Sequence, residues 1–393
     1  MRKSLNLLRE FSVPLIAGII VALIWANAGH ESYEEFVHGK YIFGFDFHFL
    51  VNDIFMVFFF AIAAVEITQS LLPGGDLNPL KKAVNPLLAT LGGVLGPAAV
   101  YLLLNAIIGE PAFTKGWGIP TATDIALAWL IARFVFGGKH PAVSFLLLLA
   151  IADDAIGLAI IAVFYPDPTT PVAPIWLLLT AAGMLISFVL RKLNVTNYWP
   201  YLLLGGVLSW VGLHNAHLHP ALALVVIIPF LPHKQQEEGH LFEEVEGEHS
   251  TLAQFEHEWK VIIDFGLFMF GLANAGVVFS EIGTPTWLVF TALLAGKTIG
   301  IFSLGYLAVK LGFPLPTSMG KKELFLAGVV AALGLTVALF VAGAAFTDLT
   351  IQGAAKMGAL FSGGVAVIAL VLGRVLRVKR ITDESSPQAA MED

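Results

Sequence analysis

The chain contains no cysteine, and this absence removes several kinds of chemistry at once. Without cysteine there is no disulfide framework, no thiolate nucleophile and no cysteine-ligated metal site. Charged side chains are also scarce, at 13% of the 393 residues, against about 25% in ordinary soluble domains. The net charge of −7 gives no sign of a nucleic-acid partner. A GxxxxGK[ST] loop is absent, so nothing favours ATP as energy source, and we expect no bound cofactor.

Apolar side chains take the place of the missing charges and make up 57% of the residues. A membrane-spanning helix needs about 20 mostly apolar residues, so twelve spans take about 240. We predict an all-α polytopic membrane protein with about 12 transmembrane helices, at residues 12–28, 54–72, 87–108, 117–136, 141–165, 172–190, 199–213, 219–232, 261–280, 285–309, 324–346 and 354–373. The seventh and eighth segments are short and are also consistent with one helical hairpin.

Basic residues test this map, because the cytoplasmic loops of membrane proteins are enriched in Lys and Arg. With the N-terminus in the cytoplasm, 18 of the 22 basic residues fall on the cytoplasmic side. Three of them, Lys40, Lys115 and Lys356, fall on the outer side, and Lys297 lies within a span. This asymmetry predicts an even number of spans with both termini in the cytoplasm. The lack of cysteine fits a bacterial membrane but does not identify the compartment.

We predict a single transmembrane domain over residues 1–380, followed by a polar, disordered tail at 381–393. The Glu- and His-rich cytoplasmic loop at 233–258 has two interpretations, a solvated connector or a proton-collecting, pH-responsive surface. Residues 41–48 are expected to form a small β-hairpin on the outer side. The N-terminal apolar run, ending in Ala26-Asn27-Ala28, also resembles a signal peptide, whose removal would leave the rest of the map unchanged.

The informative residues are charges that lie where lipid should be. Asp124 lies inside the fourth predicted span, Asp153 and Asp154 lie near the middle of the fifth, and Lys297 lies inside the tenth. Each such charge costs about 2.5–3.5 kcal/mol at the centre of a lipid-facing helix. These side chains are therefore expected to face a polar interior, to pair with one another or to be neutral.

Each charge also has a purely structural interpretation. A lone carboxylate such as Asp124 can join two helices by hydrogen bonds to backbone. An adjacent pair is harder to explain in that way, because Asp153 and Asp154 point about 100° apart on a helix and both can reach one polar cavity. Lys297 needs an anionic partner or must lose its proton. A carboxylate in the same cavity is the partner that we expect.

Two of the predicted spans contain residues that interrupt helices. The fourth reads Gly118-Ile119-Pro120-Thr121-Ala122-Thr123-Asp124, and the eleventh reads Ala332-Leu333-Gly334-Leu335-Thr336-Val337. Both breaks occupy the middle of a triplet of spans, 3–5 and 10–12. We therefore predict an inverted repeat, with two broken helices crossing at the midplane around a substrate site.

Broken helices also explain why charges of both signs are present. The N-terminal ends of half-helices carry partial positive charge and the C-terminal ends carry partial negative charge. We expect Asp124 to offset the first kind of end and Lys297 to offset the second. Asp153 and Asp154 then remain for the transported ion.

At these residues the chain resembles the NhaA family of sodium/proton antiporters, from the first span to the twelfth. The resemblance covers the paired aspartates, the Thr-Asp break and the distant lysine, in segments 119–126, 150–154, 273–276, 296–301 and 334–336, with Asn52-Asp53, Glu66 and His219 beside them. Inverted repeats with discontinuous helices are a known property of that family.

The resemblance implies an electrogenic antiporter that exchanges Na⁺ or Li⁺ for protons by alternating access through a cytoplasmic funnel. Asp154 is then the main Na⁺-binding carboxylate, and Asp153 is a second one that pairs with Lys297. Thr123 and Asp124, at one broken helix, are further candidates for binding the cation and protons, and Gly334 and Thr336 lie at the other broken helix. Protons and Na⁺ compete for the aspartates. The partners are these ions and the lipid bilayer, with the oligomeric state, a homodimer included, left open.

The resemblance also implies residues that act in the response to pH. Asp53, Glu66 and His219 match polar positions of that kind, and we add Glu256 and His257 at the end of the acidic loop. After Glu66 the family carries Lys, Arg and Glu, whereas this chain has Thr68, Gln69 and Ser70. Asp264 is a local novelty, which either pairs with Lys260 or joins the ion route. His214 and His217 are interpreted as interfacial residues rather than metal ligands.

Rival functions stay open on sequence grounds. An intramembrane aspartyl protease needs two aspartates that share a proton, and Asp124 with Asp153 or Asp154 supplies them. The Tyr-Asp and Gly-x-Gly-Asp contexts of such proteases are absent, and a buried lysine nearby would hold a catalytic carboxylate ionised. A cation channel and a related secondary transporter for another ion are two further rivals.

Overall fold

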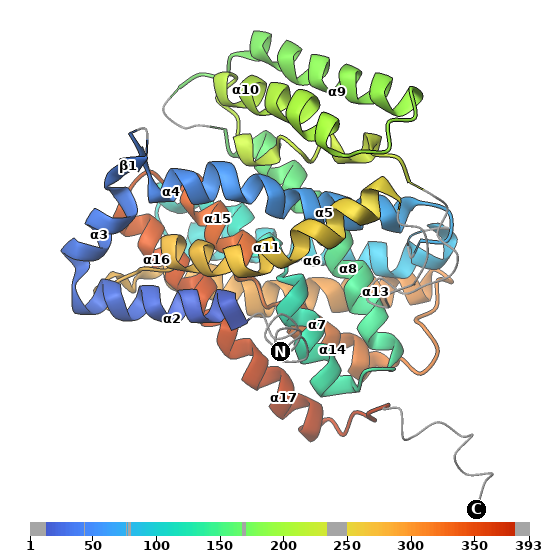
Figure 1. The fold of residues 1–393 in the computed structure, drawn as a ribbon. Helices are drawn as coiled ribbons and strands as arrows, with labels where there is room; N and C mark the ends of the chain where they lie inside the picture. The colour runs from blue at the N-terminus through green and yellow to red at the C-terminus, as the bar shows by residue number, and fades with distance from the viewer. Residues whose placement is uncertain are drawn as a thin grey trace, which may run out of the picture. The chain divides into compact units, whose positions relative to one another are not determined.

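The computed structural model describes residues 13–42, 44–75, 77, 80–166, 170–233 and 250–381, which are mostly helical (Figure 1). Residues 234–249 of the acidic loop and residues 382–393 of the predicted tail lie outside the described part. The hairpin expected at residues 41–48 is confirmed, because β1 (Lys40–Ile42) pairs antiparallel with β2 (Phe45–Asp46). Asp46 then accepts a hydrogen bond from the Phe49 backbone N–H and caps the short helix α4 (Phe47–Phe49).

Six described helices are long and apolar enough to cross a membrane, and two bent helix pairs raise this number to eight. The sequence predicts about twelve spans, and that number is not confirmed. α2 (Val13–Ala28), at the first predicted span, has only 16 residues. The long apolar helices nevertheless make this a multi-pass membrane protein.

The segment predicted as the eighth span, residues 219–232, is not an α-helix. It contains two short 3-10 turns, η5 (Pro220–Leu222) and η6 (Ile228–Phe230). Pro220 and Pro229 lie in these turns, and proline has no backbone N–H to donate within a helix. The preceding segment consists of a π-helix, η4 (Tyr201–Gly206), that continues into α10 (Val207–Asn215).

The chain separates into two compact units, a division that the sequence pattern does not indicate. Within the described part, the first unit contains residues 80–157 and 279–381, and the second contains residues 13–77 and 158–278. The boundary lies within a continuous helix, α8 (Pro141–Phe164). Each unit therefore combines segments from distant parts of the sequence.

The first unit carries all four intramembrane charges. Besides the first part of α8, its helices are α6 (Leu80–Ile108), η2 (Pro111–Thr121), α7 (Ile125–Phe136), η7 (Phe279–Glu281), α12 (Thr284–Thr291), η8 (Ala292–Lys297), α13 (Thr298–Lys310), α14 (Lys321–Ala331), α15 (Thr336–Ala345), α16 (Leu349–Phe361), η9 (Ser362–Gly364) and α17 (Val365–Val375).

Glycines bring α6 into backbone contact with the η8–α13 helix. Gly92 and Gly96 on α6 face Gly300 and Gly296, so each helix presents two glycines four residues apart. A Cβ atom at Gly92 would lie 2.0 Å from the Gly300 carbonyl oxygen, and one at Gly300 would lie 1.9 Å from the Gly92 carbonyl oxygen. Only glycine allows this approach, which is typical of helices packed in membranes.

Both interruptions predicted from the sequence are present as bent helix pairs. η2 and α7 meet at 57° across residues 122–124, and α14 and α15 meet at 51° across residues 332–335. Ala122 and Asp124 have extended backbone, so the first break is a short stretch of chain without helical hydrogen bonds. Each pair therefore exposes two helix ends inside the unit.

The second unit contains the remaining helices and the hairpin. Its other helices are α3 (His30–His38), η1 (Leu50–Phe55), α5 (Met56–Leu71), η3 (Pro174–Trp176), α9 (Leu177–Lys192) and α11 (Thr251–Asn274). α2 packs closely on α11, since a Cβ atom at Gly18 would lie 2.2 Å from the Phe268 carbonyl oxygen.

Candidate functional site

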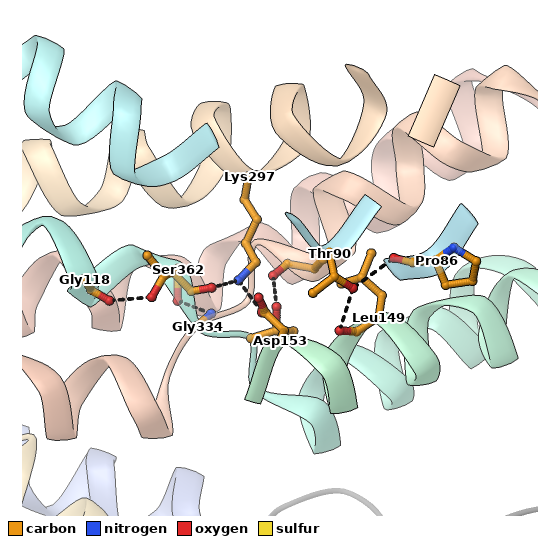
Figure 2. A network of polar contacts seen from close by, with 11 residues as sticks. Pro86, Thr90, Gly118, Leu149, Asp153, Lys297, Gly334 and Ser362 are labelled. Atoms are coloured by element: carbon orange, nitrogen blue, oxygen red, sulfur yellow. Dashed lines mark hydrogen bonds and ion pairs between the residues drawn. The ribbon is translucent and has the colours of Figure 1, made fainter. Parts of the chain in front are cut away.

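A fully buried ion pair lies in the first unit. Lys297 Nζ lies 2.7 Å from Asp153 Oδ2, and both side chains are 0% exposed. Figure 2 shows the Lys297 side chain pointing toward Asp153. Lys297 Nζ also donates to the carbonyl oxygen of Thr121 at 2.6 Å. Asp153 Oδ1 is buried as well, and within the described part of the chain it accepts no hydrogen bond. The pair thus leaves one buried carboxylate oxygen for a proton or a cation.

Local helix geometry directs Lys297 toward Asp153. Lys297 is the last residue of the π-helix η8, and such wide turns occur often at functional sites. It also lies directly after Gly296, where the backbone touches α6. A Cβ atom at Gly93 would lie 3.8 Å from Lys297 Cε, so the lysine stem runs along a glycine on α6. The close helix contact therefore holds the charge in place.

Asp154 follows Asp153 on α8 and is 8% exposed. Its negative charge also acts on Lys297. Thr90 of α6 fixes this part of α8, because its hydroxyl donates to the carbonyl oxygens of Pro86, at 2.9 Å, and Leu149, at 3.3 Å (Figure 2). Leu149 lies one helical turn before Asp153. The two aspartates therefore stand on a helix that is tied to the same neighbour as the lysine.

Asp124 lies between the N-terminal ends of two half-helices. Its Oδ1 accepts from the Leu127 backbone N–H at 3.1 Å and so caps α7. Its Oδ2 accepts from the backbone N–H of Thr336 at 3.4 Å and from the Thr336 hydroxyl, at the first residue of α15. One carboxylate thus satisfies backbone donors from both broken helices.

The two breaks touch each other through their backbones. The Asp124 N–H donates to the Leu333 carbonyl at 2.7 Å, and the Thr123 hydroxyl donates to the Ala331 carbonyl at 2.9 Å. A Cβ atom at Gly334 would lie 2.9 Å from the Ala122 carbonyl oxygen, so only glycine fits there. The two broken helices therefore meet at their interruptions.

Polar groups compensate the ends of all four half-helices. Asp124 accepts from the N-terminal ends of α7 and α15. At the C-terminal ends, Lys297 donates to the last residue of η2 and Thr123 to the last residue of α14. This charge distribution is the one that the break chemistry predicts for Asp124 and Lys297.

Two polar side chains and one backbone carbonyl of this region were missed on sequence grounds. The Thr121 carbonyl accepts from Lys297, Thr90 ties α6 to α8, and the Ser362 hydroxyl accepts from the Gly334 N–H at 3.2 Å (Figure 2). Ser362 in turn donates to the Ala359 carbonyl at 2.6 Å. A lone Thr or Ser inside an apolar span was the available signal, but such residues usually bond only their own helix.

The five residues proposed for the pH response all belong to the second unit. Lys260 Nζ lies 3.5 Å from Glu256 Oε1 on the same face of α11, with side chains 30% and 17% exposed. Gln69 Nε2 of α5 donates to Glu256 Oε2 at 2.9 Å. The charges of Lys260, Glu256 and Asp264 all act on Glu66. A half-buried cluster of opposite charges therefore joins α5 to α11, with a neutral glutamine as the direct link.

Asp53 and its neighbour Asn52 lie in the π-helix η1. The side-chain amides of Asn52 and Asn274 donate to each other, at 3.1 and 2.9 Å, and Asn52 Nδ2 also lies 2.7 Å from His48 Nε2. The Trp210 indole N–H donates to the Asp53 carbonyl oxygen at 2.8 Å. These bonds tie η1 to α10 and α11.

The histidines lie in different settings. His219 is the N-cap residue of η5, while the ring of His214 stacks on Trp210 at a centroid distance of 5.0 Å. His257 is exposed on the first part of α11. The interfacial interpretation of His214 remains a prediction.

Glu258 is exposed beside His257. A hydrogen bond donated by the Tyr198 hydroxyl, with a second one from Gln254 at 2.8 Å, holds the pKa of the Glu258 carboxyl below its usual value. Glu258 is therefore a fixed negative charge near the start of α11, rather than a group that changes its charge near neutral pH.

Comparisons with known proteins agree along almost the whole chain. A family model described as Na⁺/H⁺ antiporter 1 matches residues 4–376. The Na(+)/H(+) antiporter NhaA of Geobacter sulfurreducens is 68% identical over 381 residues, which cover 97% of this chain and 100% of that protein. The Na(+)/H(+) antiporter NhaA of Desulfitobacterium hafniense is 67% identical over 382 residues, covering 97% and 98%.

More distant proteins keep the same likeness. The Na(+)/H(+) antiporter NhaA of a Jannaschia species is 43% identical over 417 residues, covering 95% of this chain and 98% of that protein. Among solved structures, the sodium proton antiporter MjNhaP1 from Methanocaldococcus jannaschii at pH 8 is similar with a TM-score of 0.53. That likeness covers 94% and 92% of the two chains at 14% identity, so it concerns the fold alone.

Proposed function

Because this chain belongs to the Na⁺/H⁺ antiporter 1 family and exchanges Na⁺ for protons, we propose that the two ions compete at Asp154, with Asp153 as second carboxylate. The protein is a secondary transporter and not an enzyme. The observation that carries the proposal is the buried pair of Lys297 and Asp153 directly beside Asp154. Asp154 is the acid of this group with slight exposure, as an entering ion requires.

Competition follows from the chemistry of the carboxylates. Na⁺ takes oxygen ligands, which Asp154, Asp153 Oδ1 and nearby Thr or backbone oxygens supply. A proton and Na⁺ cannot both occupy Asp154. When the site faces one side of the membrane, Na⁺ displaces protons, and when it faces the other side, protons displace Na⁺. Li⁺ has the same charge and ligand preference and is a second substrate of this site.

The Lys297–Asp153 pair makes the exchange electrogenic. If Na⁺ binding breaks this pair, Lys297 releases a proton in addition to the one released from Asp154. Two protons then move against one Na⁺, and the membrane potential drives the exchange. A Lys297→Arg variant decides which residue carries the second proton, because arginine keeps its proton at all accessible pH values. If the variant still moves net charge, Asp153 carries this proton. If it does not, Lys297 carries it.

The two broken helices provide the alternating access. Thr123 and Asp124 at the first break form hydrogen bonds with Ala331 and Thr336 at the second break. Gly334 lets the two backbones touch there. Small rearrangements of these bonds expose the site to one side or to the other. The breaks lie at the membrane midplane in this proposal, as in transporters built from inverted repeats.

The charged cluster of the second unit sets the pH at which exchange begins. Glu66, Glu256 and Lys260 form it, and the partly exposed side chains of Glu256 and Lys260 let protons from the cytoplasm reach it. His257, His219 and Asp53 extend the pH response to other parts of the unit. Gln69 in place of the family's arginine weakens the electrostatic link within the cluster.

In this proposal the chain crosses the inner membrane of a bacterium about twelve times, within one transmembrane domain and with both termini in the cytoplasm. The distribution of 18 basic residues on one side supports the orientation. The role is pH and sodium homeostasis, and a homodimer is the proposed assembly.

The test uses proteoliposomes that contain a pH-sensitive dye. NaCl, LiCl or KCl is added across a range of pH values to the wild type, to Asp154→Asn and to the control Asp348→Asn. Asp348 caps α16 from an exposed position, and asparagine keeps that cap. We expect exchange with Na⁺ and Li⁺ but not K⁺, lost in Asp154→Asn and kept in the control. Exchange retained by a folded Asp154→Asn protein contradicts the assignment of Asp154.

A further inference from the structure

We propose that the pocket between the ends of α7 and α17 binds an anionic phospholipid through three arginines. The pocket has a volume of about 620 Å³, within the range of small-molecule sites. Phe134, Leu370 and Val378 contribute apolar walls, and Arg374, Arg377 and Arg380 contribute charge. All of these residues belong to the first unit, and none takes part in the ion site.

The backbone builds the pocket as a fixed structure. Arg377, two residues after the end of α17, has a positive φ of 52°, and the Val378 N–H donates to the Gly373 carbonyl at 3.1 Å. The chain then returns to α7, where the Ile381 N–H donates to the Phe136 carbonyl at 2.9 Å. The Arg380 guanidinium donates to the Phe134 carbonyl. Both walls are therefore joined at the base of the pocket.

The charges of the pocket are not neutralised by the described part of the protein. Among the described residues, no acidic side chain forms an ion pair with Arg374, Arg377 or Arg380. All three arginines are exposed. Three guanidinium groups around one pocket attract a phosphate, which they can bind with paired hydrogen bonds.

The apolar walls select a lipid rather than a free anion. Phe134 on α7 lines the pocket and is 44% exposed although it is apolar. Val375, which directly follows the pocket residue Arg374 on α17, is 68% exposed. A phospholipid satisfies both features, because its phosphate meets the arginines and its acyl chains meet the apolar surface. Basic pockets between helices on the cytoplasmic side are typical sites for anionic headgroups. The choice of a cytoplasmic-leaflet lipid rests on the proposed orientation.

Bound lipid would act on the ion site through α7. This helix begins at the Asp124 cap and ends at the pocket, so a lipid that joins α7 to α17 stabilises the position of the first break. The proposal concerns the stability of the first unit and does not require that exchange depends on the lipid.

The test uses the purified full-length chain in detergent. Phosphatidylglycerol, phosphatidylcholine or inorganic phosphate is added, and the thermal unfolding midpoint is followed while native mass spectrometry counts retained lipid. Variants are Arg374→Gln, the triple variant Arg374→Gln/Arg377→Gln/Arg380→Gln, and Lys379→Gln as control. Arg374→Gln is the most informative single variant. No described residue accepts a hydrogen bond from the Arg374 side chain, so the substitution removes the charge without breaking a described bond. Lys379 is a neighbouring basic residue that does not line the pocket.

We expect phosphatidylglycerol alone to raise the unfolding midpoint of the wild type and of Lys379→Gln. In Arg374→Gln the half-effective lipid concentration should rise about fivefold, and in the triple variant the shift should disappear. An equal shift in the wild type and in Arg374→Gln overturns the proposal, as does an equal effect of phosphatidylcholine or of phosphate alone.

Two further variants separate the remaining outcomes. If residues 382–393 fill the pocket, phosphatidylglycerol will act only on a chain shortened after Ile381, and the lipid is then not the occupant in the full chain. Asp154→Asn should respond to lipid as the wild type does. If the wild type responds to lipid but shows no Na⁺-linked exchange, the proposed function is refuted. The proposal of the lipid site is then still supported.

Discussion

Each unit has a described lysine–carboxylate pair, and the two pairs differ in distance, in burial and in how far apart the partners lie in the sequence. Lys297 and Asp153 are 2.7 Å apart and 0% exposed, and they come from helices far apart in sequence. Lys260 and Glu256 are 3.5 Å apart, 30% and 17% exposed, and lie one turn apart on a single helix. The buried pair is held by backbone contact between helices, while the other is held by the helix that carries both residues.

This difference teaches that burial decides what a charge can do. Removing one partner of a buried pair leaves an uncompensated charge in a low-dielectric interior, whereas water replaces the partner in an exposed pair. We expect the buried pair to couple ion binding to proton release, because neither of its charges can stay uncompensated in the low-dielectric interior. We expect the partly exposed pair to modulate the pH dependence of exchange, because its charges respond gradually to pH.

The largest expected effect comes from breaking the buried pair. Lys297→Gln should lower the free energy of unfolding by about 3–5 kcal/mol, because Asp153 is left buried without its cation. Asp153→Asn/Lys297→Gln should recover most of that loss, since both charges are then gone. Thermal unfolding in detergent measures each variant. A double variant no more stable than Lys297→Gln alone would show that the charge is not the cause.

A smaller effect is expected at the meeting point of the two breaks. Thr336→Val removes the hydroxyl that donates to Asp124 and should cost about 1.5–3 kcal/mol, as for hydrogen bonds to charged groups. Thr336→Ser keeps the donor and should stay close to the wild type. Unfolding midpoints and Na⁺-dependent exchange rates check both variants, and equal losses in Val and Ser would point to packing instead.

The smallest effect on stability belongs to the half-exposed pair. Lys260→Gln should change the free energy of unfolding by about 0.2–1 kcal/mol. Exchange should persist, with its pH profile moved to the alkaline side, because carboxylates release protons less readily without a neighbouring positive charge. Proteoliposome assays from acidic to alkaline pH measure this shift. Abolished exchange at all pH values would instead give this pair the same role as the buried one.

The sequence predicts much of the first unit because its signals are local. Pro120 with two threonines predicts one break, Gly334 with Thr336 predicts the other, and the cost of charge in lipid identifies Asp124, Asp153, Asp154 and Lys297. The hairpin at residues 41–48 is also encoded locally. These features depend on backbone chemistry within a few residues, which a single sequence displays directly.

The remaining features depend on contacts between distant segments. The carbonyl of Thr121 accepts from Lys297, and the hydroxyl of Thr90 reaches α8, but neither partner can be read from neighbouring residues. Residues 219–232 are apolar enough to suggest a span, yet Pro220 and Pro229 leave them as 3-10 turns. The division into two units also depends on long-range packing. The roles of the site residues in transport stay predictions until the variants are measured.

The backbone contact between α6 and α13 has a mechanical consequence. No layer of side chains separates the two helices at Gly92 and Gly300, so nothing there can repack during a sliding motion. A shift of α13 by one helical turn would bring the side chain of Leu304 or Ala292 against α6 at the position of Gly300 or Gly296, where there is no room for a Cβ atom. The two helices therefore move as one rod, and Lys297 keeps a constant position on it. We therefore expect Lys297 to stay fixed relative to α6 during transport, while the interrupted segments at the two breaks change conformation.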